Sequence, residues 1–454
     1  MLDVGSSMLD VHGVPYFDHN ATTPLSPAAR DAWLRMSDEH WHNPSSPYRA
    51  AARARIRLDS ARESLATLLG GEPAHYVFTS GATEGAHAVL ACWASILPTD
   101  TRIAVNPTEH PCVIESARKF FDGRIHWLPV TPDGVVRPEA VAAALGGAGV
   151  SPASEEVGAV VVMAANNETG VIQPWREIAR VCATARHANG GTGVPCLCDV
   201  TQWLGKLPGG GLGETHDADS PGLTLIASAH KFGGPKGVGF VKLPGETGAS
   251  GFHALPGGAQ ENDHRGGTEN LPAIAAMVAA LADAEQHHVF LETSRLRLRE
   301  QSERDLLSAL PGARIIGAGA DRLWNTISLL LPCPPDDPLA APDNARWVTL
   351  LDKRDVQVST GSACATGKTA AGGGGRMFSP PSASPRTTPA ACCASVVAGP
   401  LPRTTGELSS PQCSKSRIAP EKLCARRGFA CEARVCRTEH TYPFAGVASD
   451  APAC

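Results

Sequence analysis

The run Leu223-Thr-Leu-Ile-Ala-Ser228-Ala-His230-Lys231-Phe-Gly-Gly-Pro235 decides the fold that we expect for this chain. Its apolar, β-branched start predicts a buried strand, and the small, polar and glycine residues after it predict a turn. Lys231 would therefore lie at the carboxyl end of a sheet strand, with its amine in a cleft. Such an amine can form a Schiff base with pyridoxal phosphate (PLP), although an isolated lysine is more often a solvated surface residue.

The bulk composition is that of a globular enzyme. The chain has 454 residues, of which 43% are hydrophobic and 19% charged, so it can hold two domains or one large α/β domain with a smaller companion. Its net charge of −5 argues against a dedicated nucleic-acid-binding protein. We find no apolar run of the ~20 residues that a membrane span needs and no secretory signal at the N-terminus. The sequence therefore predicts a cytoplasmic enzyme with no membrane or nucleic-acid partner.

Strand-like and helical patterns alternate from about residue 15 to 365, which is typical of a mostly parallel sheet flanked by helices, an α/β fold. The expected strands are His75–Thr79, Arg102–Val105, Gly158–Met163, Val194–Cys198, Thr224–Ala227, Gly237–Val241 and Asn325–Leu331. The expected helices are Pro47–Leu69, Glu84–Ile96, Trp175–His187 and Pro272–Arg299. Residues 147–156 and 209–222 are expected to be loops.

The pattern divides the chain into three parts. Residues 1–270 are expected to form a large domain, with an arm at 1–25 that joins a smaller, incomplete domain at 271–369. Residues 370–454 are rich in Ser, Pro and Ala and hold half of the 14 cysteines, without amphipathic order. This composition predicts a disordered tail, and a shifted reading frame is its expected origin.

The turn Thr79-Ser80-Gly81-Ala82-Thr83-Glu84 joins an expected strand to an expected helix. Gly81 permits a tight turn, and the free N–H groups of the helix start, with Ala82 and Thr83, can bind an anion such as a phosphate. A simple helix cap is the alternative for this motif.

Asp199 follows the apolar strand Val194–Cys198. A carboxylate there can pair with a pyridinium N–H and make the ring an electron sink, or it can simply cap a helix. Gln202 lies three residues further on, where it could donate a hydrogen bond to the phenolic oxygen of the ring. Otherwise it is a polar surface residue.

Three further residues indicate a cofactor site only when they are taken together with the residues above. His110 could lie flat over a cofactor ring, and Asn167 could reach the ring oxygen or the substrate. Cys364, in a loop of small residues, could be a nucleophile if its neighbours make it a thiolate. Each residue also has a structural explanation. A histidine before a proline, such as His110, is more often structural or exposed, and the turn chemistry around Asn167 explains an asparagine equally well. Cys364 could be an inert small residue.

No metal site is expected. Cys196-Leu-Cys198 and the cysteines of the tail do not match zinc spacing. Gly361 to Thr369 resembles a phosphate-binding loop, but five residues separate its glycines where the motif needs four.

Taken together, the chain resembles the NifS-like cysteine desulfurases and the related selenocysteine lyases, of the class-V aminotransferase group of fold-type I PLP enzymes. The resemblance runs from about residue 15 to 367, and the tail does not share it. The segments that carry it are Tyr16-Phe-Asp-His-Asn-Ala-Thr-Thr-Pro24, Asn43-Pro-Ser-Ser, Thr79-Ser-Gly-Ala-Thr-Glu84, Thr108-Glu-His110, Asn166-Asn-Glu-Thr-Gly-Val-Ile172, Asp199-Val-Thr-Gln202, Ser228-Ala-His-Lys231, Gly257-Gly-Ala-Gln-Glu261, Arg265-Gly-Gly-Thr-Glu-Asn270 and Thr360-Gly-Ser-Ala-Cys364.

The resemblance implies that Lys231 holds PLP covalently and that Asp199 pairs with its ring nitrogen. It implies that His110 stacks on the ring and takes part in catalysis. The other implied cofactor contacts are Ala82, Thr83, Asn167, Gln202, Ser228, His230 and Thr268. Thr268 would reach the cofactor of the neighbouring subunit, so a homodimer is implied.

The same resemblance implies the reaction. L-cysteine becomes L-alanine, and Cys364 takes the sulfur as a persulfide for an acceptor protein such as an iron–sulfur scaffold. Asn43 would help to hold the substrate carboxylate. A selenocysteine lyase acting on L-selenocysteine is one alternative.

The chain departs from the family pattern after Cys364. The Ser-x-Arg-x-Ser-like segment, whose arginine clamps the substrate carboxylate, has no match, because Arg376, Arg386 and Arg403 stand in unrelated surroundings. Loss of that bidentate contact would weaken substrate binding. A PLP-binding but catalytically impaired scaffold is therefore the other alternative.

Overall fold

A computed structural model of the chain describes residues 14–146, 157–185, 193–212, 222–245, 251–332 and 344–360. Seven strands form its central sheet, in the order β1-β7-β6-β5-β4-β2-β3. The strands are β1 (Tyr76–Thr79), β2 (Arg102–Val105), β3 (Ile125–Trp127), β4 (Val157–Val161), β5 (Cys196–Asp199), β6 (Leu223–Ser228) and β7 (Gly239–Lys242).

Strand direction decides where the sheet can hold a site. Only β7 is antiparallel to its neighbours, β1 and β6, and the remaining pairs are parallel. The prediction of a mostly parallel sheet is thus confirmed. The carboxyl ends of β1, β2, β4, β5 and β6 consequently meet at one edge, where α/β proteins bind ligands.

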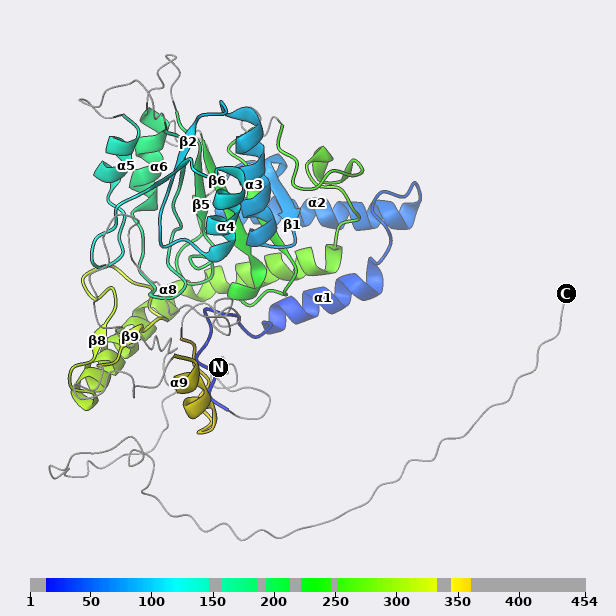
Figure 1. Cartoon of the computed structure of the whole chain (residues 1–454). Helices are drawn as coiled ribbons and strands as arrows, with labels where there is room; N and C mark the ends of the chain where they lie inside the picture. The colour runs from blue at the N-terminus through cyan, green and yellow to red at the C-terminus, as the bar shows by residue number, and fades with distance from the viewer. Residues whose placement is uncertain are drawn as a thin grey trace, which may run out of the picture. The chain divides into compact units, whose positions relative to one another are not determined.

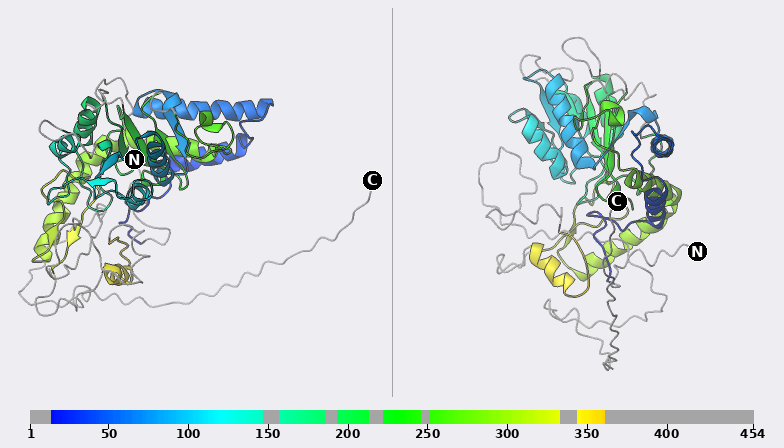
Figure 2. Two further views of the ribbon diagram at one scale, coloured as in Figure 1. Left: turned by 45° about the horizontal axis from the view of Figure 1, so that its top comes forward. Right: turned by 90° about the vertical axis from the view of Figure 1, so that its right-hand side faces the viewer.

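Helices cover both faces of the sheet (Figures 1 and 2). The α-helices of the described residues are α1 (Pro27–Glu39), α2 (Arg49–Leu69), α3 (Ala82–Ile96), α4 (Pro111–Phe120), α5 (Pro138–Ala144), α6 (Trp175–Thr184), α8 (Leu271–Ala309) and α9 (Asn344–Asp352), of which α1 packs on α8 and α9 lies away from the sheet. Successive strand residues point to opposite faces, so each strand contributes to two apolar cores. Val77 packs in one core with residues of α3 and α4, and Phe78 packs in the other with residues of α2, α6 and α8.

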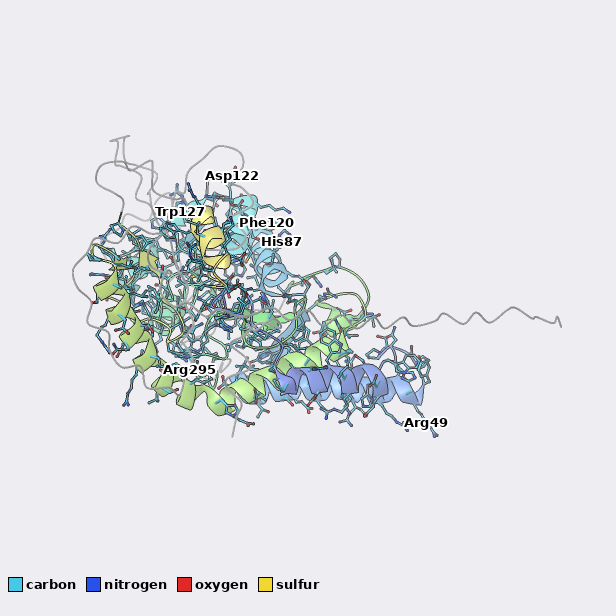
Figure 3. The ribbon with its side chains drawn as sticks, turned by 90° about the horizontal axis from the view of Figure 1, so that it is seen from below. Arg49, His87, Phe120, Asp122, Trp127 and Arg295 are labelled. Carbon is cyan, nitrogen blue, oxygen red and sulfur yellow. The ribbon has the colours of Figure 1, made fainter. Side chains whose placement is uncertain are left out.

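Helix α3 lies unusually close to the sheet. A Cβ atom on Gly85 would come within 2.9 Å of side-chain methyl groups of Ile226 and Val241, so only glycine fits there. On the outer side of this layer, His87 of α3 lies beside Phe120 of α4, with ring centroids 4.8 Å apart (Figure 3). This close packing fixes the N-terminus of α3 at the carboxyl edge of the sheet.

One expected strand is much shorter than predicted. The sequence pattern suggested Asn325–Leu331, but only β9 (Leu329–Leu330) forms, paired with β8 (Arg314–Ile315). The amide of Asn325 and the hydroxyl of Thr326 instead bond to the side chain of Asn20 at 2.9 Å. The polar start of this segment therefore joins a side-chain network rather than a β-ladder.

The predicted domain boundary after residue 270 falls at the start of α8, whose first turn Asn270 caps. The division into 1–270, 271–369 and 370–454 stays a prediction. Residue Cys364, the tail and the expected loop at 147–156 lie outside the described residues. None of the helices that the structure describes is long and apolar enough to cross a membrane.

Candidate active site

A cavity of about 230 Å³ opens at the carboxyl edge of the sheet. Every predicted cofactor residue except Thr268 lines it, each at the end of a strand or in the segment that follows one: Ala82, Thr83, His110, Asn167, Asp199, Gln202, Ser228, His230 and Lys231. A larger cavity of about 650 Å³ lies between the α5 and α6 region and residues 319–321. We place the site in the smaller cavity because it gathers a lysine, a carboxylate and a helix start.

Two predicted residues lie away from this cavity. Asn43 is in the link between α1 and α2, where its side chain accepts a hydrogen bond from the Ser45 amide at 2.9 Å. Thr268 is exposed on the segment before α8. Neither lines the cavity in the described part of a single chain, and Cys364 lies outside the described residues.

The turn between β1 and α3 is built to bind an anion. Gly81 is the N-cap of α3 and has a φ of 145°. Because glycine has no side chain, the first-turn amides are not capped from that position. The hydroxyl of Ser228 accepts a hydrogen bond from the Ala82 amide at 2.8 Å, and a Cβ atom on Gly81 would lie 3.0 Å from that oxygen. The helix dipole and the remaining amides of the first turn favour a negatively charged group here.

Lys231 reaches the cavity from the turn after β6. Its ammonium group donates hydrogen bonds to the backbone carbonyls of Asn20 at 2.6 Å and Ala21 at 2.7 Å. The side chain of Gln202 donates to the same Asn20 carbonyl at 3.0 Å. The N-terminal segment is thus bound across the cavity by two residues of the predicted site.

Asp199 lies at the end of β5 and is buried, with 6% of its surface exposed. Its carboxylate accepts a hydrogen bond from the Thr201 amide at 2.9 Å. Because Asp199 and Lys231 line the same cavity, a flat heterocycle could meet the amine and the carboxylate at once.

A second carboxyl group, Glu109, lies beneath this site. It accepts hydrogen bonds from the Asn106 amide group at 3.1 Å and from the Met163 backbone amide. Burial, reinforced by the charge of Asp199, raises the pKa of Glu109 to about 8. Glu109 is therefore predominantly protonated at neutral pH.

The two histidines of the cavity are neutral. Burial lowers the pKa of His230 to about 4, with a further decrease from the charges of Lys231 and Lys236. Burial also lowers the pKa of His110, although Asp199 opposes this change. The Nδ1 atom of His110 accepts a hydrogen bond from the Cys112 amide at 3.1 Å, so its Nε2 atom carries the proton.

Sequence reasoning missed several residues that line or support the cavity. Asp18 and Asn20 belong to the segment that we quoted for the family resemblance, and this was the available signal for them. Cys112 lies 3.0 Å from Nδ1 of His110, with no sequence signal of its own. Lys206 donates to the side chain of Gln202 at 2.9 Å, and burial, with the charge of Lys231, lowers its pKa to about 7.

The cavity fits PLP. Thr201 and Asp18 line it, and the hydroxyl of Thr201 and the Oδ1 atom of Asp18 are buried without a hydrogen-bond partner among the described residues. A bound polar group would satisfy such atoms. The helix start suits a phosphate, Asp199 a ring nitrogen and Lys231 an aldehyde. Fold and site together define a fold-type I PLP-dependent enzyme.

Comparisons with known proteins agree with this class. The class-V aminotransferase family matches residues 15–378. A cysteine desulfurase of Cereibacter sphaeroides is 34% identical over 361 residues, covering 78% of this chain and 83% of the relative. The IscS-like cysteine desulfurase of Mycobacterium tuberculosis is 31% identical over 371 residues, covering 78% and 84%. A solved NifS-like protein superposes with a TM-score of 0.66 at 28% identity, covering 76% and 87%.

This chain belongs to the class-V aminotransferase family, whose members depend on PLP. The predicted family, fold and cofactor are therefore confirmed.

Proposed function

We propose that this chain is a PLP-dependent cysteine desulfurase that converts L-cysteine to L-alanine and keeps the sulfur as an enzyme persulfide. The observation that carries the proposal is that Lys231 and Asp199 line one cavity, beside a helix start suited to a phosphate. The similarity to cysteine desulfurases over more than four fifths of their length supports the choice of substrate.

The cofactor would be held at three points. Lys231 would bind it covalently, and Asp199 would keep the ring nitrogen protonated. The phosphate would lie at the start of α3, with Ala82, Thr83, Ser228 and His230 around it. When bound, PLP withdraws electron density from the α-carbon of the amino acid.

His110 is suited to hold the ring and to move a proton. Its Nδ1 atom is occupied by the Cys112 amide, and its lowered pKa keeps the imidazole neutral. Asn167 and Gln202 would contact the ring oxygen. The carbonyl of Asn167 already accepts a hydrogen bond from the amide of Asn20 at 3.1 Å, which fixes its backbone at the cavity.

Cys364 would take the sulfur away. Its thiolate attacks the sulfur of the bound cysteine, the carbon–sulfur bond breaks, and a sulfur–sulfur bond forms on Cys364. The electron pair of the broken bond stays with the substrate carbon and, after proton uptake, gives alanine, so no external oxidant is needed. An acceptor protein would then remove the persulfide sulfur.

A homodimer would complete the site. Thr268 is exposed on its own chain and would reach the phosphate of the neighbouring cofactor. Large apolar side chains are exposed on α1, on α2 and between them, which suits a face covered by a second copy. They are Leu34, Trp41, Tyr48 and Ile56, with exposures of 51%, 69%, 50% and 61%.

Binding of the substrate carboxylate is the weakest part of the site. Asn43 is an expected contact, but the family match ends at residue 378, before any arginine in the family's setting. This observation favours a second candidate: a chain that binds PLP at the described cavity but turns over L-cysteine poorly.

Reconstitution with PLP separates the candidates. An active desulfurase releases alanine and, with a thiol reductant, an equal amount of sulfide from L-cysteine. PLP binding without either product would indicate the impaired scaffold. Faster turnover of L-selenocysteine than of L-cysteine would indicate a selenocysteine lyase, and failure to bind PLP would overturn the whole proposal.

A further inference from the structure

The turn before α3 contains a variant of the capping box. In the complete motif, the N-cap side chain bonds to a first-turn amide while a glutamate at the third helical position accepts a hydrogen bond from the N-cap amide. Here the N-cap is Gly81, which has no side chain, and Glu84 reaches one residue further back and accepts a hydrogen bond from the Ser80 amide at 2.8 Å. Glu84 therefore shapes the turn without using the amides that face the cavity.

This arrangement places a carboxylate next to an anion site. An unpaired negative charge in the first turn of α3 would oppose the binding of a phosphate there. Arg265 removes the conflict, because its Nε atom lies 3.0 Å from the other oxygen of Glu84. Although burial alone would raise the pKa of Glu84, its bonds to Arg265 and Ser80 give a net decrease, so the group is ionised.

Arg265 is held in place by the segment 257–270, which we call the strap. The strap contains three consecutive residues with positive φ: Glu261 (51°), Asn262 (54°) and Asp263 (67°). Such backbone persists only where the surroundings determine it. Those surroundings include a buried ion pair, in which Arg62 bonds to both oxygens of Glu261 at 2.8 and 2.9 Å.

The same glutamate ties the strap to β1. An oxygen of Glu261 accepts a hydrogen bond from the Phe78 amide at 2.7 Å. Phe78 lies two residues before Ser80, so the strap contacts β1 through Glu261 and the following turn through Arg265 and Glu84. The strap and the turn are thus joined at two neighbouring points.

We infer that Glu84 and Arg265 are positioning residues for the cofactor phosphate. Glu84 shapes the turn that presents the amides, and Arg265 neutralises Glu84 so that the turn still attracts a dianionic phosphate. This inference rests on the proposed binding of PLP at the described cavity. It assigns the two residues a role in cofactor affinity rather than direct contact with the reacting atoms.

A double-mutant cycle on the full chain tests the inference. The dissociation constants of PLP and of pyridoxal, which lacks the phosphate, are measured for the apo forms of wild type, R265M, E84Q and the double variant. Removing Arg265 alone leaves Glu84 unpaired, so we expect PLP binding to weaken roughly fivefold to tenfold. In the double variant the opposing charge is also gone, and PLP affinity should return to within about twofold of wild type.

Pyridoxal and a surface control separate charge from structure. Pyridoxal binding should change less than about twofold in all variants, since it carries no phosphate charge. R118M removes a matched but exposed pair, Arg118 and Glu115 at 2.9 Å, and should leave both affinities unchanged.

Three results would overturn the inference: unchanged PLP binding by R265M, equal weakening of PLP and pyridoxal binding by R265M, or no recovery when E84Q is added. Thermal unfolding of each apo variant shows whether R265M has damaged the fold. If wild type itself binds no PLP, the proposed function fails, whereas normal wild-type binding with an unchanged R265M refutes only the positioning role.

Discussion

The cofactor side and the sulfur side of this molecule differ in how the chain supplies their residues. On the cofactor side, nine predicted residues lie at the ends of five strands or just after them, and they line one cavity. On the sulfur side, Asn43 lies on a connecting loop and Cys364 lies beyond the described residues. Sheet geometry alone can assemble the first set, whereas the residues of the second set are expected on loops.

The largest effect is expected from breaking the cofactor side. K231A should abolish covalent PLP binding and lower cysteine turnover by at least about a thousandfold, because the site loses its amine. An absorbance spectrum and an alanine assay measure the two effects. Retention of a reducible cofactor adduct in K231A would show that another amine does this work.

A variant that changes only the sulfur side should separate PLP binding from sulfur transfer. C364S should bind PLP like wild type but lose persulfide formation, with at least about a hundredfold less sulfide released. Mass spectrometry of the protein after incubation with L-cysteine detects the added sulfur. C92S, at a partly exposed cysteine that does not line the cavity, is the matched control. A persulfide on C364S would place the acceptor thiol elsewhere.

Asp199 tests the electronic part of the cofactor side. D199N keeps the shape of the side chain but cannot hold a proton on the ring nitrogen, so we expect turnover to fall roughly a hundredfold. PLP should still bind covalently through Lys231. Normal turnover by D199N would contradict the assignment of this residue to the ring nitrogen.

The smallest effect is expected from Glu109, the buried carboxyl group near Asp199, and it concerns the pH dependence of stability. The pKa of Glu109 rises from 4.5 to about 8 on folding, so the folded state binds the extra proton between these values. Glu109 therefore stabilises the fold below pH 4.5, and this contribution is lost as the pH rises to about 8.

Denaturant unfolding of apo wild type and E109Q at several pH values measures this loss. The stability of wild type relative to E109Q should fall by roughly 3 kcal/mol between pH 5 and 8. A difference that does not vary with pH would show that Glu109 has an ordinary pKa in the folded chain.

Much of the cofactor side could be predicted because its signals are local. The apolar run before Lys231, the one before Asp199 and the Gly81 turn each mark a strand end, and parallel strands bring such ends together. The same logic failed for Asn325–Leu331, where apolar residues suggested a strand but long-range bonds to Asn20 determine the structure.

Contacts between distant segments left no such signal. The buried pair of Arg62 and Glu261 joins residues far apart in sequence. The three positive φ values of the strap also could not be predicted, since Glu, Asn and Asp in a row favour no single backbone conformation. Such features depend on the assembled fold.

Lys206 also provides the sharpest test of the central claim, because its buried amine, with a pKa of about 7, lies next to the same site. Borohydride reduction of the PLP-loaded chain, followed by peptide mapping, identifies the lysine that carries the cofactor. The account predicts the adduct on Lys231. An adduct on Lys206, or on no lysine of this cavity, would contradict it.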